Sequence, residues 1–165
     1  MNNDLIDRAL LELKTLGFEG FQSVRELSSS CSGLPREPGI YLVLYIDRDH
    51  PQFAPKGVGG FFKGRIPNVT VSELESKWIE DTIIIYVGQT GDSLARRLTK
   101  LIDFGMGKPV GHYGGRYIWQ IQAYHNLVIC WKSCPEGVDV RDIERELLRR
   151  FKRVHRRLPF ANLAE

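Results

Sequence analysis

Two short apolar runs, each bounded by turn residues, constrain the fold of this chain more than any other feature. The first, GIYLVLYI at residues 39–46, follows a Pro-Gly pair and ends before Asp47. The second, TIIIYVG at residues 82–88, ends in a glycine followed by the polar turn QTGDS. Apolar runs rich in β-branched and aromatic residues between turn signals predict buried strands. The core is therefore expected to form around a sheet that contains both runs.

Helical spacing of apolar residues predicts the other main elements. Helices are expected at residues 4–16 (ended by Gly17), at 94–103 (capped by Asp92 or Ser93), and from Asp139 or Asp142 to about Val154, with a short helix in 70–79 starting near Ser72. Further strands are expected at residues 20–27, 117–122 and 126–132.

The order strand, long insertion, strand, helix, strands, helix predicts an α/β (α+β) fold. We expect a single compact domain with a small central mixed β-sheet flanked by helices. Its 165 residues are enough for one domain with a real core. Residues 1–37 are interpreted as an N-terminal helix and lead-in segment, and 38–165 as the main domain with an insertion at about 47–80, all one globular unit.

Composition excludes several classes of protein. No apolar stretch approaches the roughly eighteen residues of a transmembrane helix, and acidic residues interrupt the N-terminal apolar pattern, which argues against a signal peptide. Three cysteines at irregular spacing do not suggest a disulfide framework. Cys130 and Cys134 with His125 give only three candidate zinc ligands, fewer than a structural site uses. We expect a cytoplasmic protein with no membrane partner.

The formal net charge of +3 hides a strongly basic C-terminal segment, RELLRRFKRVHRRL at residues 145–158. A clustered basic face is typical of proteins that bind nucleic acid, although a solvated helix face explains it equally well. A nucleic acid is the partner that this segment suggests, and a homodimer or a separate targeting partner stays open.

Two tyrosines stand at corresponding places in the two strong strands. Tyr41 closes the tripeptide GIY at residues 39–41, and Tyr86 opens the tripeptide YVG at 86–88. If these strands pair as neighbours, both phenols project from one face of the sheet, beside the turn that follows Gly88.

These tripeptides, followed by an arginine in a Leu-x-x-Arg-Leu pattern, a glutamate in a helix and an asparagine near the end, resemble the GIY-YIG nuclease family. The matching region runs from about residue 38 to 162. The resemblance implies a GIY-YIG-like fold and a Mg²⁺-dependent (or Mn²⁺-dependent) endonuclease that hydrolyses phosphodiester bonds in DNA. The alternative is a catalytically inactive nucleic-acid-binding module of the same fold.

The resemblance is carried over residue by residue. LARRL at residues 94–98 offers two arginines; the Leu-x-x-Arg-Leu pattern selects Arg97, whereas a strict count from Gly88 favours Arg96. The arginine outside the catalytic position is then solvated or contacts phosphate.

The metal-binding glutamate is assigned to Glu144, which has leucines three and four positions later and therefore faces the domain. Glu146, the alternative, has Arg150 at i+4, which predicts an exposed ion pair. The closing asparagine is Asn162, for which a structural role, tying the tail to the core by hydrogen bonds, is a second interpretation.

The resemblance also implies catalytic roles. One Mg²⁺ binds Glu144 and the scissile phosphate, and Arg97 holds the phosphate through its planar guanidinium. Tyr41 activates the attacking water, with Tyr86 orienting water or phosphate. A phenol has a pKa near 10 and needs a nearby cation to act as a base at neutral pH. His112 is the alternative base.

The chain departs from the family pattern in two places. About forty residues separate the tripeptides, which usually lie close together, and Gln89-Thr90 stand where many members carry a lysine. The insertion is interpreted either as decoration or as a substrate-contacting loop that acts through Lys56, Lys63 and Arg65. The expected substrate-binding residues are Arg96, Asn162, Lys63, Arg65, Arg149 and Arg153.

Overall fold

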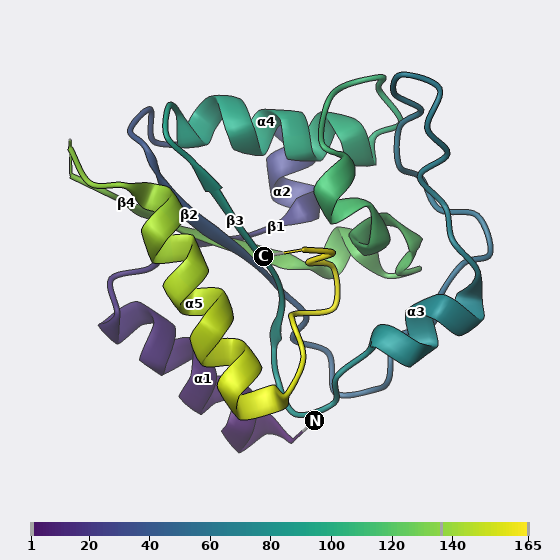
Figure 1. Cartoon of the computed structure of the whole chain (residues 1–165), viewed down its shortest axis with the longest axis horizontal. Coiled ribbons are helices and arrows are strands. Elements are labelled where there is room, and N and C mark those ends of the chain that lie inside the picture. Colours follow the sequence, from purple (N-terminus) through teal and green to yellow (C-terminus); the bar gives the residue numbers. More distant parts are fainter. Residues whose placement is uncertain (1, 136, 165) are drawn as a thin grey trace.

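The computed structural model of the chain describes residues 2–135 and 137–164. The α-helices are α1 (Asn3–Thr15), α2 (Val24–Ser29), α3 (Val71–Lys77), α4 (Leu94–Gly105) and α5 (Val140–His155), and the 3₁₀ helices are η1 (Tyr113–Gln120) and η2 (Tyr124–Asn126). The strands are β1 (Glu19–Ser23), β2 (Gly39–Leu44), β3 (Ile84–Thr90) and β4 (Val128–Ser133). Figure 1 shows these elements arranged around one sheet. None of the described helices is both long and apolar enough to cross a membrane.

The sheet has four strands in the order β1-β4-β2-β3, and every neighbouring pair is antiparallel. The prediction of an α+β domain with a small sheet is confirmed, but the prediction of a mixed sheet is wrong. After the connection through α4 and η1, β4 runs in the same direction as β3. However, β4 pairs on the other side of β2, so strands of the same direction are never neighbours. The two tripeptides thus lie on adjacent strands although the insertion separates them in sequence.

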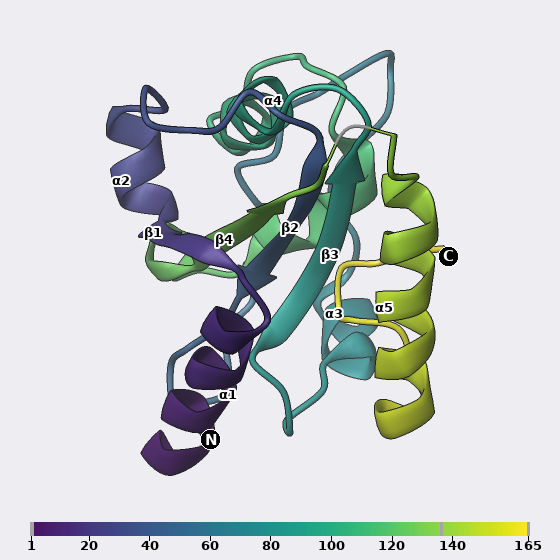
Figure 2. The same cartoon turned by 90° about the vertical axis from the view of Figure 1, so that its left-hand side faces the viewer.

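Helices cover both faces of the sheet (Figure 2). The side chains of β2 alternate between two cores, because successive residues of a strand point to opposite faces. Tyr41 and Val43 join the core formed with α2, α4 and η1, whereas Leu42 and Leu44 join the core formed with α1 and α5. All six residues of β2 are buried, which explains why its sequence is an unbroken apolar run.

Side-chain caps set the helix starts near the predicted positions. Ser93 accepts a hydrogen bond from the Arg96 amide at the start of α4, and Asp139 caps α5. The α3 helix begins at Val71 because the cap is Thr70, not a residue near Ser72.

The prediction of a strand through residues 20–27 is correct only as far as Ser23. There the Ser23 hydroxyl accepts from the Glu26 amide, and the Glu26 carboxylate accepts from the Ser23 amide. This reciprocal capping box starts α2, so the second half of the expected strand is helical.

The prediction of a strand at residues 117–122 is wrong. Tyr117 to Ile121 are all buried, and most of the segment belongs to η1; only Ile121 forms an isolated bridge, with Phe53. The segment does not join the sheet: β4 already pairs with β1 and β2, and the C-terminal tail lies on β3 through a bond from the Ala161 amide to the Ile85 carbonyl.

The insertion between β2 and β3 is anchored to η1. The buried Gln120 side chain donates to the carbonyls of Ala54 and Val69 and accepts from the Val69 amide. The Gly57 amide donates to the Asn68 side chain, which closes the loop on itself. The predicted irregular insertion therefore has a defined position beside η1.

Candidate active site

The pairing of β2 with β3 places the two tripeptide tyrosines together. Tyr41 stands opposite Gly88, and Tyr86 stands opposite Val43, so the two phenols share one face of the sheet with their ring centroids 6.0 Å apart. A Cβ at position 88 would lie 2.3 Å from Cζ of Tyr41. The Tyr41 ring therefore packs directly over Gly88, which is possible because glycine has no side chain.

Tyr41 contacts His112, which lies immediately before η1. The Tyr41 hydroxyl is 3.0 Å from Nε2 of His112, and both side chains are buried. Burial, together with the charge of Arg97, lowers the pKa of His112 to about 3, so the imidazole is neutral. Burial raises the pKa of Tyr41 well above its ordinary value, with a further contribution from Tyr86. A protonated phenol and a neutral imidazole therefore share this hydrogen bond, and the tautomer of His112 sets which of the two donates.

Arg97 lies beside both phenols. It follows Leu94 by three positions and precedes Leu101 by four, so it belongs to the buried face of α4. Its charge and hydrogen bonding favour the ionised phenols and oppose the effect of burial on the pKa values of Tyr41 and Tyr86. Arg96 is turned by about 100° around the helix, is exposed and pairs with Asp92. The two adjacent arginines thus have different environments, and only Arg97 lies at the tyrosines.

Glu144 reaches the same place from α5. It stands on the buried stripe of the helix with Val140 and Leu148, and it is half-buried. Burial raises its pKa, and the charges of Arg97 and Arg145 oppose this shift. Among the residues that the structure describes, none forms a hydrogen bond or a salt bridge with the Glu144 carboxylate.

Glu146 has a different environment. Its carboxylate accepts a bond of 2.8 Å from Nε of Arg150, and both side chains are largely exposed. The predicted surface ion pair is confirmed, and Glu146 does not belong to the buried cluster.

Arg97 is the centre of the cluster electrostatically. Its positive charge acts on Tyr41, Tyr86, His112 and Glu144, and Glu144 in turn acts on Tyr86. These five side chains come from β2, β3, α4, α5 and the loop before η1. The structure therefore brings together all five residues that were predicted to be catalytic.

Asn162 lies at the edge of β3 rather than in this cluster. Its side-chain oxygen accepts from the Val87 amide at 2.9 Å, and its side-chain nitrogen donates to the Val87 carbonyl at 2.8 Å. The carboxamide thus replaces a neighbouring strand. The structure supports the structural interpretation of Asn162 over substrate binding, because the oxygen and the nitrogen of its carboxamide both bond to the backbone of Val87.

Two other predicted substrate contacts point away from the cluster. Around an ideal helix, Arg149 and Arg153 are displaced from Glu144 by about 140° and about 180°. Both are exposed, and their charges act on Glu146, on the outer face of α5. They therefore do not line the site around Glu144, and their contact with substrate stays a prediction.

Lys63 and Arg65 do lie near the cluster, through the insertion. Arg65 stands over the ring of Tyr113, the residue after His112, and Lys63 stands over the ring of Phe62. Tyr113 and Arg116, which carry the other half of this contact, were not singled out from the sequence. The one available signal was the grouping of histidine, tyrosine and arginine around two glycines in GHYGGRY.

The donor set bears on which metal this site suits. Among the described residues, no group of three or more His, Cys, Asp or Glu side chains forms a ready-made metal site. A zinc centre needs such a group. Mg²⁺ keeps most of its water and binds proteins through one or two carboxylates together with substrate phosphate. A single half-buried Glu144 with no competing partner fits Mg²⁺ or the similar Mn²⁺.

Comparison with known proteins gives no match to a family model, to a curated protein or to a solved structure. The functional argument therefore rests on the geometry of Tyr41, Tyr86, Arg97, His112 and Glu144.

Proposed function

We propose that this protein is a metal-dependent phosphodiester hydrolase. The observation that carries the proposal is that the guanidinium of Arg97 acts on two buried phenols and on a carboxylate that has no hydrogen-bond partner among the described residues. Phosphodiester hydrolysis needs a positioned water, positive charge at the phosphate, and help for the leaving oxygen. The phenols can position a water, the guanidinium supplies the positive charge, and the carboxylate can hold a metal that helps the leaving oxygen.

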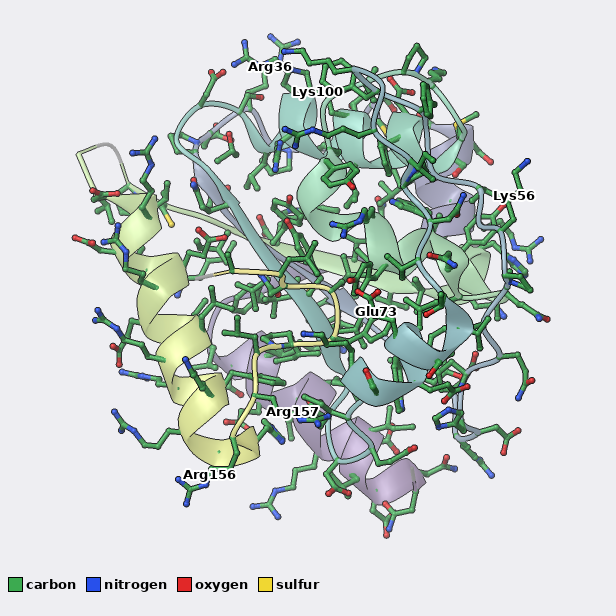
Figure 3. All side chains as sticks on the ribbon, turned by 45° about the vertical axis from the view of Figure 1, so that its right-hand side comes forward. Arg36, Lys56, Glu73, Lys100, Arg156 and Arg157 are labelled. Carbon is green, nitrogen blue, oxygen red and sulfur yellow. The ribbon has the colours of Figure 1, made fainter. Side chains whose placement is uncertain are left out.

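More specifically, we propose a Mg²⁺-dependent DNA endonuclease of the GIY-YIG type. The order of the tripeptides, their pairing on adjacent antiparallel strands, and the arginine and glutamate beside them support this reading. Basic side chains on several sides of the molecule support a polyanionic substrate. Figure 3 shows Arg36 and Lys100 on the side of α4, and Arg156 and Arg157 at the C-terminal end of α5.

In this mechanism the guanidinium of Arg97 binds the scissile phosphate and compensates the charge that grows on its oxygens. Tyr41 contacts the attacking water, and Tyr86, 6.0 Å away between ring centroids, orients water or phosphate. Glu144 would hold Mg²⁺, which when bound would supply Lewis-acid stabilisation of the leaving oxygen. Tyr41 accepts a proton from the water only as the phenolate, so the phenol must first lose its own proton to solvent. Burial opposes that ionisation, and the charge of Arg97 favours it.

His112 is a positioning residue in this scheme rather than the base. Its pKa of about 3 makes the imidazole a poor proton acceptor at neutral pH. The hydrogen bond between its Nε2 and the Tyr41 hydroxyl holds that hydroxyl in place. The earlier alternative, in which His112 activates water, is less consistent with this environment.

The test is cleavage of supercoiled plasmid by the purified protein with Mg²⁺ and with EDTA. We expect nicking or linearisation that needs the metal and falls at least about 100-fold in Glu144→Gln, since that change removes the negative ligand. The matched control is Glu146→Gln, two residues away on the same helix but exposed and paired with Arg150. It is expected to cleave like the unmodified protein.

Full cleavage by Glu144→Gln would overturn the assignment of the metal ligand. Equal loss in both variants would point to a general effect on α5. Salt-sensitive DNA binding without any Mg²⁺-dependent cleavage would instead support a binding module of the same fold.

A further inference from the structure

Residues 56–66 of the insertion, KGVGGFFKGRI, form a projecting loop that we name the arm. The insertion contains three basic residues and no acidic residue between His50 and Ser72. Backbone bonds from Val58 to the Trp119 carbonyl and from Gly60 to the Phe104 carbonyl hold the base of the arm on η1 and α4. Figure 3 shows Lys56 projecting outward from this part of the chain.

The tip of the arm packs beside the candidate active site. Its Phe62 ring lies against Gly111, where an added Cβ would be 3.4 Å from Cε1 of the ring. The Tyr113 hydroxyl donates to the carbonyl of Ile66 at 3.2 Å. Gly111 and Tyr113 flank His112, which binds Tyr41. The arm therefore contacts the two residues on either side of His112, a member of the catalytic cluster.

Two arginines share one aromatic ring at this junction. Cζ of Arg65 lies 5.4 Å and Cζ of Arg116 lies 4.3 Å from the ring centroid of Tyr113. Neither guanidinium forms a salt bridge with a residue that the structure describes, and Nε of Arg116 is buried without a hydrogen-bond partner there. Arg116 also lies 4.8 Å from the ring centroid of Tyr117. Two guanidinium groups that share a ring and form no salt bridge with a described residue are a favourable site for a phosphate, which accepts hydrogen bonds from such donors.

Large apolar side chains flank this charge. Phe61 is 58% exposed and Ile66 is 65% exposed, although both belong to an anchored loop. Exposed aromatic rings between basic groups stack on the bases of single-stranded nucleic acid, and apolar side chains also insert between base pairs. In continuous duplex DNA the base faces are already stacked on each other, and inserting a side chain between them costs unstacking free energy. Phe61 therefore stacks at the lowest cost on an unpaired base.

We propose that the arm is a second DNA subsite that selects substrates with a single-stranded segment beside the cleavage point. Arg65 and Arg116 bind a phosphate of that segment, and Phe61 stacks on one of its unpaired bases. This inference rests on the proposed endonuclease function and specifies the substrate class. Because the arm is already anchored to η1 and α4, little conformational entropy is lost when it binds DNA, and this favours affinity.

The test measures binding in the Glu144→Gln background, so that the DNA stays intact. Fluorescence anisotropy compares a forked DNA that has a single-stranded arm with a blunt duplex of the same length. Phe61→Ala is expected to weaken binding to the fork by about 5- to 100-fold, the range for loss of one stacked base, and to leave duplex binding unchanged. Leu11→Ala is the matched control, because Leu11 is an equally exposed side chain on α1.

A second series tests the phosphate contact. Arg65→Gln and Arg116→Gln are each expected to weaken binding and to reduce the slope of log affinity against log salt by about one counterion. Arg8→Gln on α1 is the control, with no change expected. Circular dichroism of each variant checks that the fold is retained.

Loss of affinity that is equal for fork and duplex, or an unchanged fork preference in Phe61→Ala, would overturn the arm proposal. The result is independent of the nuclease test. Mg²⁺-dependent cleavage with an unchanged fork preference leaves the nuclease standing and removes this inference. A lost fork preference in a protein that cleaves no DNA removes the nuclease and supports the subsite.

Discussion

The most direct test of the site geometry is Gly88→Ala. The new methyl carbon would lie 2.3 Å from Cζ and 2.5 Å from the hydroxyl oxygen of Tyr41. Ordinary contact begins at 3.4 Å, so the ring must move by roughly 1 Å. Tyr41 is fully buried, so it cannot swing into solvent. Overpacking of this kind costs about 1–3 kcal/mol of unfolding free energy.

The same shift displaces the Tyr41 hydroxyl from Nε2 of His112, now 3.0 Å away. A displacement of about 1 Å in a catalytic group costs about 100-fold in rate. Gly88→Ala is therefore expected to reduce Mg²⁺-dependent plasmid cleavage about 100-fold, while urea denaturation still reports a cooperatively folded protein.

Gly91→Ala is the matched control, because its Cβ would meet only Cγ2 of Val140, at 3.9 Å. It is expected to leave both cleavage and stability near those of the unmodified protein. Unchanged cleavage and stability in Gly88→Ala would refute the argued position of the Tyr41 ring. An equal loss in both variants would show that the effect belongs to the β3–α4 turn and not to Tyr41.

Two further predictions concern stability. Asn162→Ala removes both hydrogen bonds to Val87 and exposes the edge of β3, so we expect a loss of about 1–3 kcal/mol in urea denaturation; a smaller change than that would mean that water replaces the carboxamide. For His112, the pKa of about 3 in the fold lies below the ordinary 6.5, so the folded state binds fewer protons. Its contribution to stability is present above pH 6.5 and is lost as the pH falls toward 3, with about 2 kcal/mol already lost at pH 5. Comparing urea denaturation of the unmodified protein and His112→Gln at pH 7 and pH 5 isolates this contribution, and equal pH dependence in the two would contradict the buried neutral imidazole.

The elements that sequence reasoning predicted correctly are those with local causes. The strands β2 and β3 follow from apolar runs between turn residues, and the starts of α4 and α5 follow from caps at Ser93 and Asp139. Glu144 was preferred to Glu146 by its place on a helix face, which depends only on spacing along the chain, and Arg97 was preferred to Arg96 by the Leu-x-x-Arg-Leu pattern. Local periodicity decides which side of an element a residue occupies.

Periodicity failed where the partner of a segment is distant in sequence. Residues 117–122 have a strand-like composition, but they lie in η1 and in an isolated bridge with the distant Phe53. Arg149 and Arg153 were singled out from the basic run alone, although helical spacing by itself already turns them away from Glu144. Asn162 matched a motif position, but its side chain pairs with Val87, 75 residues earlier.

The sequence by itself determined the secondary-structure types of the two tripeptide strands and the chemical identities of the five clustered side chains. Only the tertiary structure decided that Tyr41 meets His112, 71 residues away, and that the insertion reaches the other side of this histidine through Tyr113. The physical reason is that hydrogen-bonding and packing partners far apart in the chain are selected by the closing of the whole core. Neither the composition of a segment nor its period carries that information.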